Sequence, residues 1–162
     1  MIYKHRGLLT ALLGVLLLLL PPAPFEFIGI PFFIAATFLR VWARMHIGEH
    51  SRGAELACPE IAQSGPYKYA KHPLYISNFI AGTSLAIFHA GFSLGTLIFC
   101  LVYGIFLSFL ARKENLFLKS SPKSPISNPQ YPQSSVIKAI INDRFTWLWQ
   151  VVMLVLIIVI AD

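Results

Sequence analysis

Residues 74–111 read LYISNFIAGTSLAIFHAGFSLGTLIFCLVYGIFLSFLA and contain two apolar runs, at 74–88 and 94–111. Neither run contains an aspartate, glutamate, lysine or arginine, and only the short turn HAGFS at 89–93 separates them. Connections of this length join antiparallel helices that pack against each other. The stretch therefore predicts a helical hairpin whose two free ends lie side by side.

Three further apolar segments flank this hairpin, at residues 7–20, 25–43 and 145–161. A helix needs about 20 apolar residues to cross a bilayer, within a range of about 17–25. The segments at 25–43, 94–111 and 145–161 reach this length, whereas the other two must tilt or thin the bilayer. We expect an all-α, polytopic membrane protein with five transmembrane helices, of which the third and fourth form the hairpin.

The composition agrees with a membrane protein. Of the 162 residues, 56% are hydrophobic and only 12% are charged, whereas a soluble domain carries about 25% charged residues. The two cysteines lie in a polar loop and in an apolar run, which gives no disulfide framework. The formal net charge of +6 would suggest nucleic acid in a soluble chain, but here the basic residues follow the membrane topology. We therefore expect the lipid bilayer, and no nucleic acid, as a partner; the oligomeric state is left open.

The basic residues define the predicted orientation. With the N-terminus in the cytoplasm, all 13 lysines and arginines fall on the cytoplasmic side or at its membrane edge, and the outer turns at 21–26 and 89–93 contain none. This is the distribution that the positive-inside rule describes. Trp42, Trp147 and Trp149 lie at the ends of predicted spans, where an aromatic belt is expected. In a bacterium, the protein would be in the inner or plasma membrane.

The first apolar segment has a second interpretation. A basic start and a leucine-rich core are also typical of a secretory signal peptide. The Pro-Pro and Ala-Pro pairs at 21–24 make a poor cleavage site, which favours an uncleaved first span.

The predicted organisation is a single integral membrane domain over residues 1–162. Its parts are the first two spans (1–43), a cytoplasmic loop (44–73), the hairpin with its cytoplasmic extension (74–118), a Ser/Pro-rich loop (119–144) and the last span (145–162). No loop is long enough to hold a separate core. Any chemistry is therefore expected where the cytoplasmic loops meet the helix ends.

The hairpin geometry predicts that His72 and Glu114 are neighbours. At about 1.5 Å per residue, the third helix climbs from Leu74 to the turn in about 16 residues, and the fourth descends the same distance from Ser93 to about residue 109. The residues that follow therefore emerge level with His72. Far apart in the sequence, the two side chains meet at one end of the hairpin.

The stretch GPYKYAKHPLY at 65–75 leads into the third helix. Pro73 disfavours a helical conformation at His72 and suits the first turn of the helix that follows. The free N–H groups of that helix start, with Lys71 beside them, suit a carboxylate or a phosphate.

Other side chains extend this predicted site. The rings of Tyr67, Tyr69 and Tyr75 offer faces to a base or a sulfonium, and Glu114 can accept hydrogen bonds from an ammonium or from ribose hydroxyls. Together these groups suit a ligand with an aromatic base, a carboxylate and a positive charge.

The run Gly-Pro-Tyr-x-Tyr-x-Lys-His-Pro-x-Tyr, followed by a helical hairpin with a glutamate at its far end, resembles the isoprenylcysteine carboxyl methyltransferase family and related membrane phospholipid methyltransferases. Residues 39–49, LRVWARMHIGE, are similar to the family's stretch at the end of the second span, and the resemblance covers about residues 37–118. It implies an S-adenosylmethionine site at the cytoplasmic ends of the last helices. It also implies a lipophilic acceptor that arrives laterally from the lipid.

The resemblance carries over to particular residues. His72, Pro73, Leu74 and Tyr75 match the family's cofactor-contacting run, and Glu114 matches its acidic position. The expected cofactor-binding set is Tyr67, Lys71, His72, Pro73, Leu74, Tyr75 and Glu114. The expected substrate contacts are Asn78 and Arg44. We nominate no covalent nucleophile, and His72 and Glu114 are the candidates for positioning or for a base.

The chain also departs from the family pattern. The family usually has two consecutive glutamates followed by a Phe-Gly…Tyr…Tyr pattern, whereas this chain has Glu114, then Asn115 and Leu118, and only Tyr131 in the loop beyond. Glu114 can match either glutamate. The methyl acceptor therefore stays open between a carboxylate, an amine and a thiol.

Several of these residues have structural interpretations as well. Tyr69 suits the aromatic belt, Lys68 and Lys71 suit topology, Glu114 could form a solvated ion pair with Arg112 or Lys113, and Asn78 could bond a neighbouring helix. The glycines at 82, 95 and 104 suit helix packing. A metal site at His46, Glu49, His50 and Cys58 is not expected, because only the spacing of the two histidines fits one.

The leading hypothesis is a membrane methyltransferase that depends on S-adenosylmethionine. One alternative is an NADPH-dependent sterol-type reductase, which would be expected to show more arginines and an acidic and basic C-terminal cluster. Another is a non-catalytic membrane relative or scaffold that binds partners through its basic cytoplasmic face.

Overall fold

The predicted apolar segments form helices in the computed structural model, which describes residues 6–24, 26–47, 64–120 and 134–161. Every regular element in these ranges is helical. They are α1 (Arg6–Leu18), α2 (Gly29–Ile47), the 3₁₀ turn η3 (Gly65–Lys68), α3 (Pro73–Ala90), α4 (Leu94–Ser120), α5 (Val136–Asn142) and α6 (Arg144–Ala161).

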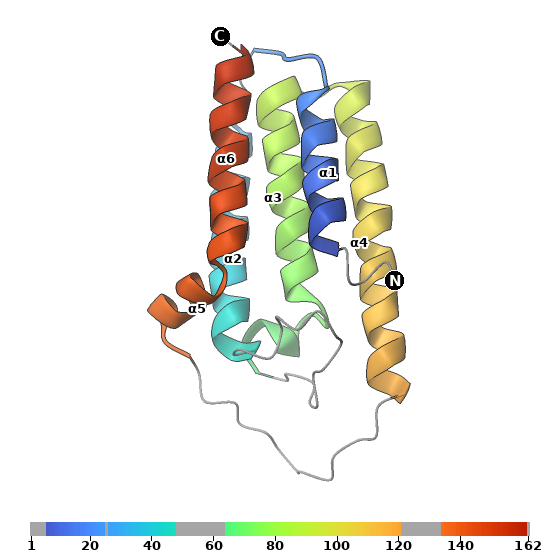
Figure 1. Ribbon diagram of the computed structural model, residues 1–162, viewed down its shortest axis with the longest axis vertical. Helices are drawn as coiled ribbons and strands as arrows, with labels where there is room; N and C mark the ends of the chain where they lie inside the picture. Colours follow the sequence, from blue (N-terminus) through green and yellow to red (C-terminus); the bar gives the residue numbers. More distant parts are fainter. Residues whose placement is uncertain (1–5, 25, 48–63, 121–133, 162) are drawn as a thin grey trace.

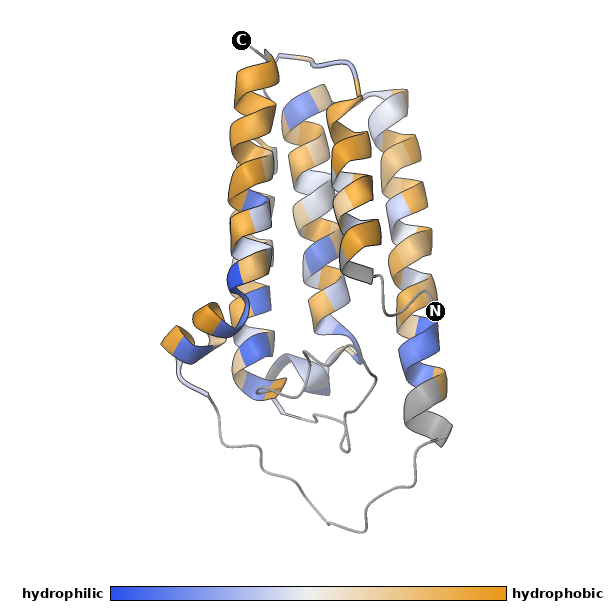
Figure 2. Cartoon of the chain, viewed as in Figure 1, coloured by the Kyte–Doolittle hydropathy of each residue, from blue (hydrophilic) through white to orange (hydrophobic). Residues whose placement is uncertain are grey.

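The long helices lie alongside one another in a single bundle (Figure 1). α2 packs most extensively against α3, and α3 packs against α4. Figure 2 shows the sides of the bundle to be largely apolar, with hydrophilic residues towards the end that carries α5 and η3. Many leucines, isoleucines, valines and phenylalanines are exposed on these sides, as expected for an integral membrane protein.

Two helices, α2 and the 94–116 part of α4, are long and apolar enough to cross a membrane. α5 and α6 are bent by 69° at their junction and make a third candidate if they count as one broken span. α1 is a shorter apolar helix over Leu8–Leu18. By length and composition, the described residues thus contain two or three candidate spans, fewer than the five that the sequence predicts.

The turn between α3 and α4 is closed by its own residues. Gly91 adopts φ +59° and its N–H donates to the carbonyl of Ile87 at 2.9 Å, so the backbone takes a left-handed conformation that favours glycine. At the start of α4, the N–H of Thr96 donates to Ser93 Oγ at 3.1 Å. These two caps reverse the chain within three residues.

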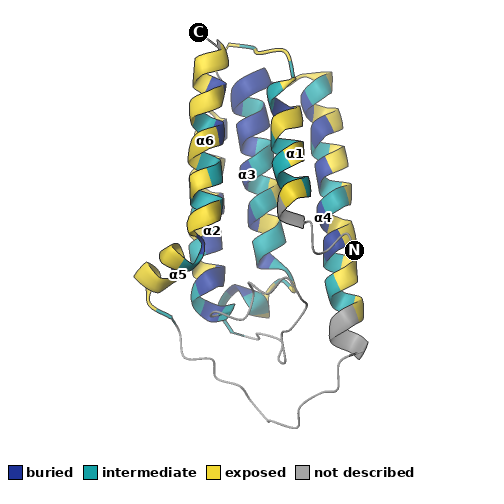
Figure 3. Cartoon of the chain, viewed as in Figure 1, coloured by how far each residue is buried: buried dark blue, intermediate teal, exposed yellow. Residues whose placement is uncertain are grey.

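The core lies between the helices, and the exposed residues face outwards (Figure 3). Leu85, Tyr103 and Met153 belong to one buried apolar cluster. A Cβ atom at Gly82 would lie 2.4 Å from Cε1 of Tyr103, so the α3 backbone contacts that ring directly. The predicted packing role of this glycine is confirmed.

Residues 119–144 differ from the predicted loop. α4 continues to Ser120, and α5 occupies Val136–Asn142. Ser135 caps α5 by accepting a hydrogen bond from the N–H of Lys138 at 3.3 Å. A helix of seven residues is too short to give a clear periodic signal, which is why the sequence pattern did not reveal it.

Candidate functional site

The hairpin brings the start of α3 level with the C-terminal part of α4, as predicted. Nδ1 of His72 lies 3.5 Å from Oε2 of Glu114, and its Nε2 lies 3.0 Å from Oδ1 of Asn115. We call these three residues the His72 cluster. The predicted contact between His72 and Glu114 is confirmed, and Asn115, the next residue of α4, joins it.

The His72 cluster favours a charged imidazole. The hydrogen bond to Glu114 raises the pKa of His72 above its usual value; burial acts in the opposite direction, and Asn115 adds to the increase. In the protonated ring both nitrogens are donors, and each faces a side-chain oxygen here. In its protonated form the ring can donate a hydrogen bond to each of these oxygens, which suits a role in positioning.

The loop before α3 is held by the end of α2. Nδ1 of His46 lies 3.0 Å from Oγ of Ser64. Gly65 has φ +57°, and a Cβ atom there would lie 2.4 Å from Cδ2 of His46. The backbone of the loop therefore lies directly on the imidazole ring, a role for His46 that the sequence analysis did not anticipate.

No group of three or more possible metal-ligating side chains occurs in the part of the chain that the structure describes. Glu49, His50 and Cys58, the other residues considered for a metal, lie outside the described ranges.

The other residues of the predicted cofactor loop and of the start of α3 differ in how far they are exposed. Tyr75 lies with its ring centroid 5.6 Å from that of His72. Pro73 is buried at the first position of α3, while Tyr67 and Leu74 are half-buried. Lys71 is exposed, and Tyr69 is 85% exposed. The ring of Tyr75 is thus an aromatic face beside His72.

Asn78 and Arg44, the predicted substrate contacts, lie in a second group deeper in the bundle. Arg40 donates from Nε to Asp143 and from Nη1 to Oδ1 of Asn78. Nη2 of Arg40 lies 3.0 Å from Oγ1 of Thr146, and Nη2 of Arg44 lies 2.8 Å from Oδ1 of Asp143. These five residues form what we call the Arg40 cluster.

The three charged residues of the Arg40 cluster are almost completely shielded from solvent, while Asn78 and Thr146 are half-buried. Arg40, Arg44 and Asp143 are 6%, 8% and 2% exposed. Their contacts join α2 to α3 and to the junction of α5 and α6. The sequence analysis counted the two arginines only as cytoplasmic charges and Arg44 as a substrate contact, because no local pattern relates them to an aspartate about a hundred residues away.

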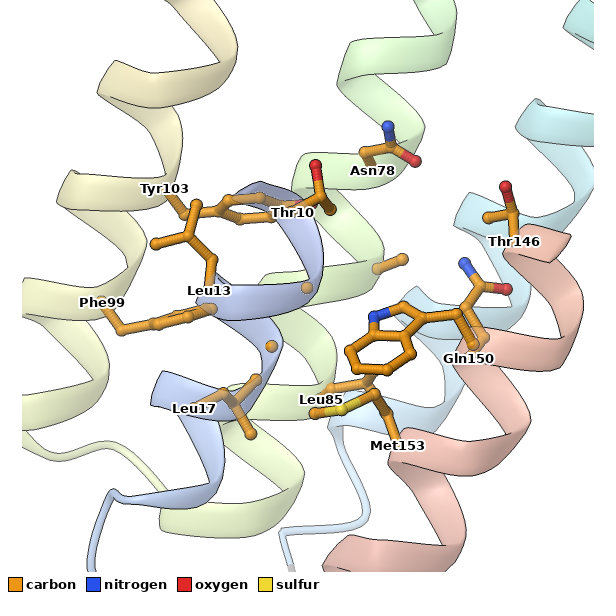
Figure 4. A pocket seen from close by; sticks show the side chains of 14 residues that line it. Thr10, Leu13, Leu17, Asn78, Leu85, Phe99, Tyr103, Thr146, Gln150 and Met153 are labelled. Carbon is orange, nitrogen blue, oxygen red and sulfur yellow. The ribbon is translucent and has the colours of Figure 1, made fainter. Parts of the chain in front are cut away.

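A cavity of about 70 Å³ opens between α1, α3, α4 and α6, next to the Arg40 cluster. One end is polar, with Thr10, Asn78 and Thr146 (Figure 4). The other end is apolar, with Leu17 and Met153. The lining is completed by Leu13, Gly14, Ala81, Gly82, Leu85, Phe99, Tyr103, Trp149 and Gln150.

Comparison with known proteins adds a family match. The sequence pattern of the isoprenylcysteine carboxyl methyltransferase family matches residues 28–120, more than half of the chain. The matched range contains α2, the loop before α3, and the whole hairpin with the His72 cluster. No curated protein and no solved structure gave a significant match.

Proposed function

This chain belongs to the isoprenylcysteine carboxyl methyltransferase family, and from that membership we propose that it transfers the methyl group of S-adenosylmethionine to a lipophilic acceptor within the membrane. The observation that carries the proposal is the His72 cluster, because it lies inside the matched range and unites the histidine of the loop with the acidic position of α4.

The residues at the His72 cluster fit this cofactor. S-adenosylmethionine supplies an electrophilic methyl group on a sulfonium, and it carries an adenine, ribose hydroxyls, an ammonium and a carboxylate to be bound. Glu114, with 26% of its side chain exposed, can accept hydrogen bonds from the hydroxyls or the ammonium. Tyr75 offers an aromatic face. Lys71 and the first N–H groups of α3 suit the carboxylate.

The cavity supports a lipophilic acceptor. Its walls are mostly apolar, and its polar end is towards the end of the bundle at which α3 begins, where His72 caps that helix (Figures 1 and 4). An apolar part of the acceptor in the cavity would keep water away from the group that receives the methyl. Methyl transfer to an anionic acceptor depends chiefly on proximity, alignment and exclusion of water, so the protein needs no covalent nucleophile.

The proposed topology has five spans, formed by α1, α2, α3, α4 and α6, within one membrane domain and with a cytoplasmic N-terminus. It is supported by the side-by-side arrangement of these helices (Figure 1) and by the hydrophilic residues at one end of the bundle (Figure 2). The distribution of lysine and arginine supports the orientation.

Binding to the purified protein tests the function. The melting temperature of the protein in detergent is measured with S-adenosylmethionine and, separately, with NADPH. We expect only S-adenosylmethionine to raise it, because a ligand that binds the folded state alone stabilises that state. His72→Ala and Glu114→Ala should abolish the increase, and Tyr69→Ala, at an exposed position of the same loop, should retain it.

The other outcomes of this experiment would support a different function or a different cofactor site. Stabilisation by NADPH alone would support a reductase, and stabilisation by neither would support a non-catalytic membrane protein. An increase that survives both substitutions would place the cofactor site away from the His72 cluster.

A further inference from the structure

We propose that α5 lies in the membrane–water interface, with its exposed apolar side chains among the lipid chains and with Lys138 and Arg144 at the head groups of negatively charged phospholipids. In this position α5 is neither part of the α6 span nor a helix in water. The inference goes beyond the proposed function: it rests on the proposed crossing of the bilayer by α6, and it does not depend on methyl transfer.

The exposed side of α5 is a continuous apolar arc. Four β-branched residues are 44–69% exposed: Val136, Ile137, Ile140 and Ile141. At about 100° per residue they occupy adjacent positions over about 140° of the helix circumference, and we call them the apolar arc. Lys138 and Asn142 are the next positions around the helix. An apolar face beside a basic and polar one is the pattern of a helix that lies at a membrane surface.

The rotation of α5 about its own axis is fixed by contacts with the rest of the protein. α5 packs against α2, and its buried residue is Ala139, which is 1% exposed. At the start of α5, the N–H of Ser134 donates to the carbonyl of Met45 at 3.0 Å. At its end, Asp143 belongs to the Arg40 cluster. The apolar arc is therefore held in one orientation, on the side of α5 that the protein leaves uncovered.

The location of α5 follows from its connection to α6. Asp143 alone separates the two helices, which are bent by 69° at this junction. α6 lies along the bundle, and α5 projects sideways from it at the hydrophilic end (Figures 1 and 2). With α6 upright in a bilayer, α5 is nearer to the membrane plane than to the membrane normal. A helix of 7 residues is only about 10 Å long, so no part of α5 can be far from the lipid surface.

Exposed apolar residues continue from α5 into α6. Phe145 and Leu148, just beyond the junction, are exposed, as is Val155 farther along α6. The indole N–H of half-buried Trp147 donates to the carbonyl of Ile140 at 3.1 Å, so a tryptophan lies at the junction, as is typical of a membrane interface. We therefore take lipid, which the proposed span brings against this surface of α6, as the partner that covers the apolar arc.

The charges around the apolar arc suit negatively charged head groups. Lys138 and Arg144 are both exposed. Within the described ranges no ion pair of either residue is found, and the adjacent carboxylate, Asp143, is bound to the arginines of α2. Lysine and arginine can keep their alkyl stems in the apolar layer while their charges reach lipid phosphates. Phospholipids with a net negative head group therefore complement this surface.

Spin labels measure the depth of α5. In the full chain with Cys58→Ser and Cys100→Ser, a label is attached at Ile137→Cys in the apolar arc, at Lys138→Cys beside it, or at Val155→Cys in α6. The protein is placed in nanodiscs of equal parts phosphatidylcholine and phosphatidylglycerol. Collisions of the label with oxygen, which concentrates in lipid, and with a water-soluble nickel chelate report its depth. We expect the label at Val155 to be deepest, that at Ile137 to lie at the head-group boundary, and that at Lys138 to be open to the chelate.

Three results would overturn the interfacial position. Equal access of the chelate to the labels at Ile137 and Lys138 would place α5 in water. Protection of both labels, at the depth of Val155, would make α5 part of the span. An immobilised label at Ile137, shielded from both reagents, would show that protein, such as a second copy of the chain, covers the apolar arc. A label at Val155 that is open to the chelate would overturn the proposed span together with this inference, whereas the first three results leave the span intact.

Brominated lipids test the preference for negative charge. Trp42→Phe and Trp149→Phe leave Trp147, at the α5–α6 junction, as the single tryptophan. We expect brominated phosphatidylglycerol to quench its fluorescence more strongly than brominated phosphatidylcholine in otherwise identical nanodiscs. Lys138→Gln and Arg144→Gln should each lower the ratio of the two apparent lipid affinities about fivefold, the factor expected for one basic residue near the lipid surface.

The control for these substitutions is Lys113→Gln, because α4 and α5 lie on opposite sides of the bundle (Figure 1); it should keep the parent ratio. Equal quenching by the two lipids in the parent protein, or an unchanged ratio in both Lys138→Gln and Arg144→Gln, would overturn the assignment of these residues to anionic head groups. Neither experiment contains S-adenosylmethionine, so a failure of cofactor binding and a failure of the α5 surface are observed independently.

Discussion

The His72 cluster and the Arg40 cluster are both built from a cation and a carboxylate, but they differ in burial and in connectivity. The His72 cluster is partly exposed and joins the two helices of one hairpin, 3.5 Å apart at His72 and Glu114. The charged residues of the Arg40 cluster are buried, and the cluster joins α2 to α3 and to the α5–α6 junction. The comparison separates two tasks: the partly exposed pair can be reached by a ligand, as the proposed function requires, whereas the buried charges hold helices and side chains in position.

Removal of the shared carboxylate should have the largest effect. Asp143→Asn leaves two buried guanidiniums without their anion, and we expect it to lower the free energy of unfolding by about 3–5 kcal/mol. Unfolding by SDS in mixed micelles measures this loss. Arg144→Ala, at the exposed neighbouring position, is the control and should change stability by less than about 0.5 kcal/mol. Equal effects of the two substitutions would remove the distinction between the clusters.

The corresponding change in the His72 cluster should affect binding and not folding. Glu114→Gln is expected to weaken S-adenosylmethionine binding about tenfold, because a charge-assisted hydrogen bond is lost, and to change unfolding by less than about 1 kcal/mol. Titration calorimetry and SDS unfolding measure the two quantities. Lys113→Gln, whose ammonium lies over the ring of Phe109, is the matched control. A loss of stability as large as that of Asp143→Asn would show that Glu114 is structural.

The pH dependence provides a finer distinction. The pKa of His72 is raised in the folded protein, chiefly by Glu114. The stabilisation from this pair is therefore fully present below the unfolded pKa of about 6.5 and is lost as the pH rises through the higher folded pKa. We expect the melting temperature to fall across this window in the parent protein, and a flatter profile in His72→Gln. Identical profiles would contradict the proposed protonation of His72.

The smallest effect is expected at Asn115. Asn115→Ala removes one of the two oxygens that face the imidazole, so the pKa of His72 should fall, but by less than in Glu114→Gln, because Glu114 is the larger cause. NMR titration of ¹³C-labelled histidine measures both values, and the spectrum of His72→Gln assigns the signal. A larger decrease in Asn115→Ala than in Glu114→Gln would reverse the order of the two partners.

The two clusters also differ in how far the sequence could predict them. The contact between His72 and Glu114 follows from the lengths of two apolar runs and the short turn between them, so the sequence alone places these residues at one level. The contacts of Asp143 depend on which face α6 presents to α2. No short connection fixes that rotation, because residues 48–63 and 121–133 intervene along with the hairpin.

The span count shows the same limit. Apolar length identified α2 and α4, which the structure supports as candidate spans. α5 was assigned to a loop, because seven residues between a Ser/Pro-rich stretch and an apolar helix carry little periodic information. His46 was considered as a metal ligand, and its contact with Gly65 depends on a positive φ angle that residue spacing does not reveal.

That contact between His46 and Gly65 restricts how the chain can diverge. Any side chain at position 65 would both strain a left-handed backbone and collide with the imidazole. A smaller residue at position 46 would remove the collision but also the partner of Ser64. Neither position can drift alone without displacing the loop that precedes α3. The two residues should therefore be inherited together, and a homologue that has lost one of them is expected to have rebuilt this loop.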